Sequence, residues 1–217
     1  QTFKLIRNQS LPKIDRIQSI NFDSKSELIS CSGMNQSYLF SPDSLKYLTT
    51  FNNLNNTTVI INESLIGVKY GSTDIQEYSI SSEKLIRDFE PSPTTPTKNL
   101  IVSNDGKFVL GYGYCNMTLW NNSGLKIHDF TRIKNPIHGI NTNGHLVSCG
   151  IGSKGASRLF NLKTLEFEQE FHHHGSTVLS TLIKDDHIWL FGADQRAIKL
   201  DLDSYRLLES FNIDDPK

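Results

Sequence analysis

The sequence predicts an all-β chain in which one unit of four antiparallel strands is repeated five times. Phenylalanine recurs about every forty residues along the 217-residue chain, each time closing a similar segment: LKYLTTF, EKLIRDF, GLKIHDF, LEFEQEF and YRLLESF. The closing residues are Phe51, Phe89, Phe130, Phe171 and Phe211. A self-similar period of this length indicates one repeated supersecondary unit. Short apolar runs separated by turn residues indicate that the unit consists of strands.

Four candidate strands fill each repeat, and we name them a to d in chain order. Strands a are expected at residues 17–22, 57–62, 99–103, 137–141 and 177–183. Strands b follow at 27–33, 65–71, 107–113, 145–151 and 187–193, and strands c at 37–41, 75–80, 117–121, 157–161 and 197–202. Strands d are the Phe-ended segments. All are rich in β-branched and aromatic residues, and no stretch supports a helix of normal length.

Turn-forming residues separate these strands at matching places. The a–b turns carry Asp23-Ser24, Asn62-Glu63, Asp105-Gly106, Asn143-Gly144 and Asp185-Asp186. The c–d turns carry Pro42-Asp43, Ser81-Ser82, Asn122-Ser123, Lys163-Thr164 and Asp203-Ser204. Gly, Asn and Asp adopt the positive φ that many tight turns require, and Pro fixes φ at a value suited to a turn. Each repeat is therefore expected to form hairpins.

Units of this length and strand order resemble the blades of WD40-type β-propellers. The Trp-Asp pair that ends strand c in that family has counterparts here in Phe40-Ser41, Tyr78-Ser79, Trp120-Asn121, Phe160-Asn161 and Leu200-Asp201. Asp194 matches the family's aspartate in the b–c turn, and His174 precedes a strand near the place of its Gly-His pair. The resemblance implies a propeller with five full blades in a single domain, 1–217. The blades are expected near 15–51, 57–89, 98–130, 136–171 and 176–211.

One further strand is expected at residues 4–9. The segment KLIRNQ is similar to KLIRDF at 84–89 and reads as a lone strand d. We expect it to complete a blade other than the one containing Phe211, so the five blades would be part of a larger or partner-completed propeller. The chain starts at Gln1, which favours an N-terminus further upstream.

Composition excludes several classes of protein. The formal net charge of −1 argues against a surface dominated by nucleic-acid or membrane binding, and no apolar run approaches membrane-spanning length. Cys31, Cys115 and Cys149 lack metal-ligand spacing and are expected to be buried small side chains, which favours the cytoplasm or nucleus. Glycosylation sequons keep secretion open as an alternative; they begin at Asn8, Asn35, Asn55, Asn56, Asn62, Asn116 and Asn121.

No constellation of residues predicts a catalytic, cofactor or metal site. The run Gly150–Gly155 spells GxGxxG, but a strand is expected after it, and a dinucleotide site needs a helix there. The run His172–His174 lies on an extended chain, whose adjacent side chains point in alternate directions, so a loop with one buried, hydrogen-bonded His is favoured over a metal site. No nucleophile has an evident base, and we expect a protein that is not an enzyme.

A proline-rich stretch, residues 90–97, separates the second and third repeats. We interpret it as a rigid connector, because its three prolines lack the backbone N–H that a central strand needs for its hydrogen bonds. Ser92-Pro93 and Thr95-Pro96 are alternative candidates for phosphorylation.

The expected function is a non-catalytic interaction scaffold within a multiprotein complex. In the propeller architecture the d–a and b–c loops share one face, which would be basic and suited to acidic or phosphorylated partner segments. The candidate partner-binding residues on it are Lys13, Tyr114, Arg132, Lys134, Lys154 and Arg196. An RNA-associated assembly subunit and a secreted propeller hydrolase or lectin are the alternatives.

Overall fold

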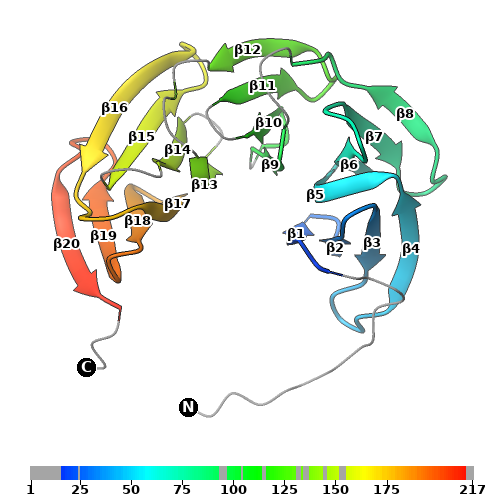
Figure 1. Cartoon of the computed structure of the whole chain (residues 1–217), viewed down its shortest axis with the longest axis horizontal. Helices are drawn as coiled ribbons and strands as arrows, with labels where there is room; N and C mark the ends of the chain where they lie inside the picture. Colours follow the sequence, from blue (N-terminus) through cyan, green and yellow to red (C-terminus); the bar gives the residue numbers. More distant parts are fainter. Residues whose placement is uncertain are drawn as a thin grey trace. The chain divides into compact units, whose positions relative to one another are not determined.

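Twenty strands, and no helix, make up the secondary structure of the residues described by the computed structural model. These residues are 16–23, 25–92, 97–103, 105–113, 116–130, 133, 137–143, 146–151 and 155–213. The strands form five four-stranded antiparallel sheets, as the repeat predicts. Figure 1 shows that the strands of each sheet lie side by side in chain order, so each repeat makes one sheet. The expected strand at residues 4–9 lies outside the described residues.

The chain divides into two compact units, and the boundary between them falls within β9. The first unit contains two sheets. Its first sheet consists of β1 (Ser19–Asp23), β2 (Leu28–Ser32), β3 (Gln36–Phe40) and β4 (Tyr47–Asn52). Its second sheet consists of β5 (Leu54–Ile61), β6 (Ser64–Lys69), β7 (Ile75–Ser79) and β8 (Leu85–Asp88). The expectation that residues 1–217 form one domain stays a prediction.

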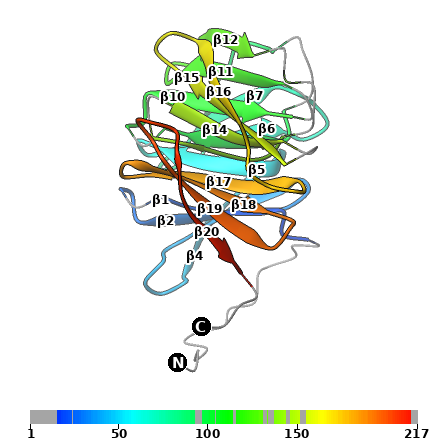
Figure 2. The same ribbon diagram turned by 90° about the vertical axis from the view of Figure 1, so that its left-hand side faces the viewer.

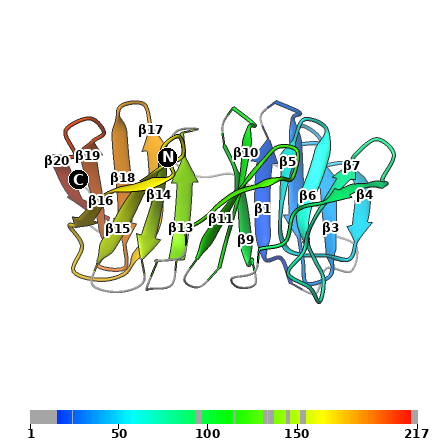
Figure 3. The same cartoon turned by 90° about the horizontal axis from the view of Figure 1, so that it is seen from above.

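The second unit contains the other three sheets (Figure 2). The third sheet consists of β9 (Asn99–Val102), β10 (Phe108–Tyr112), β11 (Met117–Asn121) and β12 (Lys126–Phe130). The fourth consists of β13 (Ile137–Thr142), β14 (Leu146–Ile151), β15 (Ala156–Asn161) and β16 (Glu166–His172), which Figure 3 shows from another side. The fifth consists of β17 (Val178–Lys184), β18 (His187–Gly192), β19 (Arg196–Asp201) and β20 (Leu207–Asn212).

The same irregularity interrupts all five sheets, between the third and fourth strands. The register shifts immediately before Phe40, Tyr78, Trp120, Phe160 and Leu200, which are the residues at the position of the family's tryptophan. A bulge leaves one residue unpaired and increases the local twist of the sheet. The repeat in sequence is therefore also a repeat in backbone geometry.

The turns that follow these bulges are repeated too. Six residues before each recurring phenylalanine, the backbone adopts a positive φ, at Leu45, Glu83, Gly124, Leu165 and Tyr205. Only one of the five is glycine, although glycine adopts this conformation most easily. The side chain that begins the turn compensates in part: Asn161 Oδ1 accepts hydrogen bonds from the backbone N–H groups of Lys163 and Thr164. The residue that follows the bulge thus caps the turn, a role that Ser, Asn and Asp can all fill.

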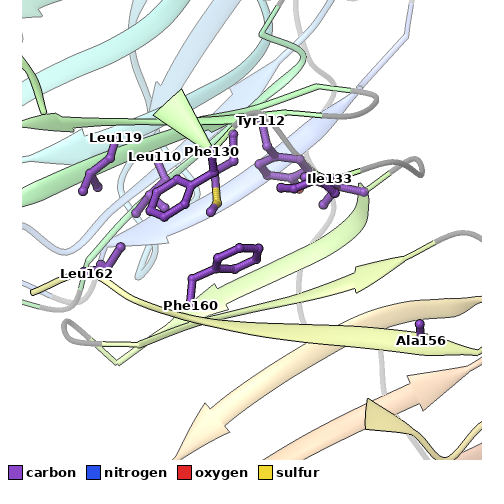
Figure 4. Close-up of a cluster of buried hydrophobic side chains, with 10 residues drawn as sticks. Leu110, Tyr112, Leu119, Phe130, Ile133, Ala156, Phe160 and Leu162 are labelled. Atoms are coloured by element: carbon purple, nitrogen blue, oxygen red, sulfur yellow. The ribbon is translucent and has the colours of Figure 1, made fainter. Parts of the chain in front are cut away.

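The recurring phenylalanines form part of the core, as the repeat predicts. Phe51, Phe89, Phe130 and Phe171 are 2%, 4%, 5% and 3% exposed. Phe51 packs with Ile60 and Leu65 of the second sheet, and Phe171 packs with Ile183 and Ile188 of the fifth. Phe130 of the third sheet faces Phe160 of the fourth, as Figure 4 shows. Neighbouring sheets within each unit are therefore held together by apolar side chains that the repeat places at equivalent positions.

Cys31 is buried in β2, as expected for a small apolar side chain. Burial raises the pKa of its thiol above the usual value, which makes it less reactive. Cys149 lies in β14, the corresponding second strand of the fourth sheet, and Cys115 lies outside the described residues.

Candidate protein-binding surface

An open groove of about 520 Å³ lies between the third and fourth sheets of the second unit. Its floor is apolar and consists of Phe130, Ile133, Phe160 and Phe167. Phe130 and Phe160 meet edge to face with ring centroids 5.1 Å apart, and Phe160 meets Phe167 in the same way at 5.9 Å. Phe130 and Phe160 are buried, but Phe167 is 52% exposed. The exposed ring of Phe167 therefore extends the apolar surface of the core to the mouth of the groove.

Charged side chains line the groove from both sheets, and each carboxylate has a cationic partner. Arg158 Nε lies 2.5 Å from Glu170 Oε2, and His172 Nε2 lies 2.8 Å from Glu170 Oε1. The hydrogen bond from Arg158 is the main reason that the pKa of Glu170 lies below its usual value. Glu170 is consequently a stable carboxylate at neutral pH, unsuited to hold a proton for acid catalysis.

Asp129 is neutralised on the other side of the groove. Its Oδ2 lies 3.0 Å from Lys126 Nζ, and its Oδ1 accepts a hydrogen bond from Thr118 Oγ1. Ion pairs of this kind fix the positions of side chains around an apolar floor. The arrangement suits an apolar or aromatic side chain on the floor and polar groups of a bound chain at the rim.

The histidine run does not converge on one point. His174 is buried, and its Nδ1 donates a hydrogen bond to Asp194 Oδ1 at 2.8 Å. His172 instead pairs with Glu170, while His173 stacks on Phe171 with ring centroids 6.3 Å apart. One buried, hydrogen-bonded histidine is what the sequence predicts for this loop. No group of three metal-ligating side chains occurs in the part of the chain that the structure describes.

The His174–Asp194 contact joins the loop before β17 to the turn between β18 and β19. The Gly175 backbone N–H also donates to Asp194 Oδ2 at 2.9 Å. Burial would raise the pKa of Asp194, but the hydrogen bonds from Gly175 and His174 lower it below the usual value. A side chain at Gly192 would collide with this pair, because a Cβ there would lie 2.3 Å from His174 Nδ1. His174 and Asp194, the two residues of the last repeat that resemble the WD40 pattern, thus stabilise the fold through their hydrogen bond.

Burial also lowers the pKa of His173, and the neighbouring positive charges of His174, Arg196 and His172 lower it further. His173 is therefore mostly neutral at pH 7 and adds little charge to the predicted basic face.

Arg196 is the one predicted partner-binding residue within the described part of the chain. It is half-buried in β19, and its guanidinium donates to the His173 carbonyl and to Ser210 Oγ. Part of its donor capacity is thus already used within the fifth sheet. Lys13, Tyr114, Arg132, Lys134 and Lys154 lie outside the described residues.

Sequence reasoning missed the groove. The pairing of Arg158 with Glu170 could have been predicted from the sequence, because the two residues are cross-strand neighbours when β15 and β16 are aligned. The exposure of Phe167 could not be predicted in this way, because an apolar residue in a predicted strand is expected to lie in the core. The GxGxxG run is followed by β15, a strand, as the sequence predicts.

Comparison with protein-family models and with curated proteins gives no match for this chain. Within the described residues, no helix is long and apolar enough to cross a membrane.

Proposed function

We propose that this protein is a divergent WD40-type β-propeller that acts as a non-catalytic interaction scaffold in a multiprotein complex. The proposal is supported by five sheets of equal strand number and order, with the same bulge before the fourth strand. The observation that carries it is the groove beside β12 and β16, where an exposed aromatic ring lies among side chains fixed by ion pairs. The cytoplasm or nucleus is the proposed location.

The same groove argues for a protein partner over RNA. Asp129 is paired with Lys126 and Glu170 with Arg158, so the rim offers no excess positive charge to bind phosphate groups. Aromatic floor residues with paired charges around them are typical of the anchoring pockets of protein interfaces. We therefore propose that a partner polypeptide inserts an apolar side chain against Phe167.

The secreted alternative is disfavoured at two of its sequons. Asn116 is 8% exposed, and Asn121 Oδ1 accepts hydrogen bonds from the backbone N–H groups of Ser123 and Leu125. Attachment of a glycan requires an exposed asparagine side chain.

Site-specific photo-crosslinking tests the function. A photoreactive phenylalanine analogue at Phe167 should crosslink to a polypeptide in native cells, and the same analogue at Leu85 should not. Leu85 is a matched control because it occupies the same place in β8 and is 47% exposed. Mass spectrometry of the adducts identifies the partner. Adducts to RNA, or equal crosslinking from both positions, would count against a protein-binding groove.

A further inference from the structure

The fourth sheet ends in a strand whose outer side has no partner strand. Among the described residues β16 pairs only with β15, and Figure 1 shows it as the last strand of its sheet. The two faces of this sheet are covered, since Phe160 packs on Phe130 of the third sheet and Phe171 packs on Ile183 of the fifth. We call the unpaired side of Glu166–His172 the β16 edge. It stays open although both neighbouring sheets are in place.

The β16 edge is the longest of its kind among the five sheets as described. β16 has seven residues, whereas β4 and β20 have six, β12 has five and β8 has four. Natural edge strands are often short, because a long row of unpaired backbone N–H and C=O groups invites pairing with another chain. The β16 edge therefore offers the longest ladder to an incoming strand.

The backbone of Glu170 is directed toward this edge. In an antiparallel ladder, every second residue of an edge strand turns both of its backbone groups away from its neighbour. In the second sheet the Phe89 N–H donates to the Ile75 carbonyl, so the equivalent Phe171 faces β15 and Glu170 faces outward. The Glu170 carbonyl accepts a hydrogen bond from Gln169 Nε2 at 3.1 Å. A local side chain thus supplies the donor that a paired strand would supply.

The β16 edge is acidic. Glu166, Glu168 and Glu170 occupy every second position of the strand, and only Glu170 is paired, with Arg158 and His172. Glu166 and Glu168 are exposed and form no ion pair with any described residue. Opposite charges on facing strands stabilise the pair, and like charges destabilise it. The edge therefore favours a basic strand and disfavours β16 of a second copy, which would set glutamates against glutamates.

An exposed aromatic ring lies beside these charges. Phe167 is 52% exposed, pairs with Phe160 across the two strands and lies at the mouth of the groove. Alternate side chains of a strand point to the same face of the sheet. A strand added at the β16 edge therefore directs every second side chain toward the groove, where an apolar one contacts the Phe167 ring.

We propose that the partner binds as an extended basic segment, which joins the fourth sheet at the β16 edge and sets an apolar side chain against Phe167. The inference rests on the proposed function, since it specifies how the groove recognises its partner. Main-chain hydrogen bonds supply affinity, and the glutamates with Phe167 supply specificity. The basic face expected from the sequence consists of loops and not of this strand, so it concerns other segments of the partner.

Three synthetic peptides test the pairing with the purified full chain. The basic probe is KVKFKVK with blocked termini, the acidic probe is EVEFEVE, and KPKFKPK keeps the charge and the aromatic ring but cannot form a regular ladder. Fluorescence anisotropy should give a Kd below about 1 mM for the basic probe. The other two should bind at least about tenfold more weakly.

Each contrary result of this comparison counts against the proposal. Absence of binding by the basic probe would overturn it. Equal affinity for KPKFKPK would reduce the contact to charge attraction without strand pairing, and equal affinity for EVEFEVE would remove the charge selection. Both outcomes contradict a basic segment bound as a strand.

Charge reversal on β16 assigns the site. Glu166→Lys with Glu168→Lys should weaken binding of the basic probe by about tenfold and strengthen binding of the acidic probe. Glu27→Lys with Glu63→Lys is the matched control, because both residues are exposed in turns of the first unit and the net charge changes equally. Circular dichroism checks folding. Equal effects of the two pairs would show that only net charge matters and would overturn the β16 edge as the site.

Two substitutions at His172 separate the backbone from the side chain. His172 lies two residues beyond Glu170 in regular register, so its N–H also faces outward. His172→Ala and His172→Pro both remove the imidazole, but only proline removes the N–H, a change that edge strands tolerate. The proline variant should bind the basic probe about tenfold more weakly than the alanine variant. Equal affinities of the two variants would overturn main-chain pairing.

Photo-crosslinking at Phe167 distinguishes failure of this inference from failure of the proposed function. Mass spectrometry should place the crosslink within a basic segment of the partner polypeptide. A crosslinked segment without basic residues would overturn the strand pairing and leave the proposed function standing. Adducts to RNA, or none, would overturn the proposed function whatever the peptides do.

Discussion

At the residue scale, the hydrogen bond between His174 and Asp194 depends on the absence of a side chain at Gly192. A Cβ there would lie 2.3 Å from His174 Nδ1 and 2.4 Å from Asp194 Oδ1, and both atoms belong to side chains that the fold holds in place. Gly192→Ala should thus break the hydrogen bond and reduce the free energy of unfolding by at least about 0.5–1.5 kcal/mol. Urea denaturation measures the loss.

Gly175→Ala is the matched control for that substitution. A Cβ at Gly175 would meet only Asp194 Oδ2, at 4.0 Å, and the Gly175 N–H would still donate to Asp194. The free energy of unfolding should therefore change by less than about 0.5 kcal/mol. Equal losses from the two variants would show that the space around His174 is not what makes Gly192 necessary.

Phe130 and Phe211 occupy equivalent positions but have different environments. Phe130 is 5% exposed between two sheets, while Phe211 is 39% exposed. Phe130→Ala should cost about 3–5 kcal/mol by the usual large-to-small penalty, whereas Phe211→Ala should cost clearly less. Chemical denaturation at low protein concentration compares them. A loss below about 0.5 kcal/mol for Phe130→Ala would mean that this phenylalanine is not a core residue.

At the scale of single elements, the turn between β15 and β16 tests the capping role of the residue after each bulge. Asn161 Oδ1 accepts from Lys163 N at 2.8 Å and from Thr164 N at 3.2 Å, and the turn contains Leu165 at a φ of 62°. Asn161→Ala removes both acceptor contacts and should reduce stability by about 1 kcal/mol. Asn161→Ser retains an acceptor without adding a charge beside Glu168, as Ser79 Oγ accepts from the Ser82 N–H in the second sheet, and should restore part of the lost stability. No difference between the two variants in thermal denaturation would refute the capping role.

The pairing of β15 with β16 should make stability depend on pH. Hydrogen bonding by Arg158 lowers the pKa of Glu170 below its usual value, so the carboxylate stabilises the folded state above its unfolded pKa. That contribution should be present at pH 7 and should disappear as pH falls through the folded pKa. Because both side chains are partly exposed, Glu170→Gln should cost only about 0.5–1 kcal/mol at pH 7.

Melting temperatures of wild type and Glu170→Gln, measured from pH 7 down to pH 3, check this dependence. The two curves should converge in acid. Glu166→Gln, on the same strand and exposed, is the control and should follow the wild type throughout. If the melting temperatures of wild type and Glu170→Gln differed by a constant amount from pH 7 to pH 3, the effect would come from packing of the side chain and not from its charge.

At the scale of the whole molecule, the predicted basic face is tested by charge reversal. Arg132→Glu with Lys134→Glu should slow association with the partner identified by crosslinking, because surface charges steer encounter more than they hold a complex. Stability should be nearly unchanged. In the propeller architecture the a–b turns lie on the opposite face, so reversal of Lys25 and Lys107, two exposed residues of such turns, is the control. Stopped-flow kinetics measures the rates, and equal slowing by both pairs would refute a directional basic face.

The strand plan was readable from the sequence because turn residues and apolar alternation act locally. The third strand of the third repeat was expected at 117–121 and is observed as Met117–Asn121. The largest difference is β5, which was expected to begin at residue 57 and begins at Leu54. The asparagines after Leu54 read as a loop, but a shift in register between Asn55 and Thr58 lets Leu54 pair with Lys69 and become fully buried.

The sequence alone determined the repeat, the strand order and the recurring phenylalanines, because each rests on local patterning and on a period that can be counted. Tertiary structure decided which side chains meet across strands and sheets. It placed Arg158 opposite Glu170, brought Phe167 to the mouth of a groove, and left Phe211 exposed where Phe130 is buried. The physical reason is that exposure depends on what covers a face, and residues far apart in the chain supply that cover.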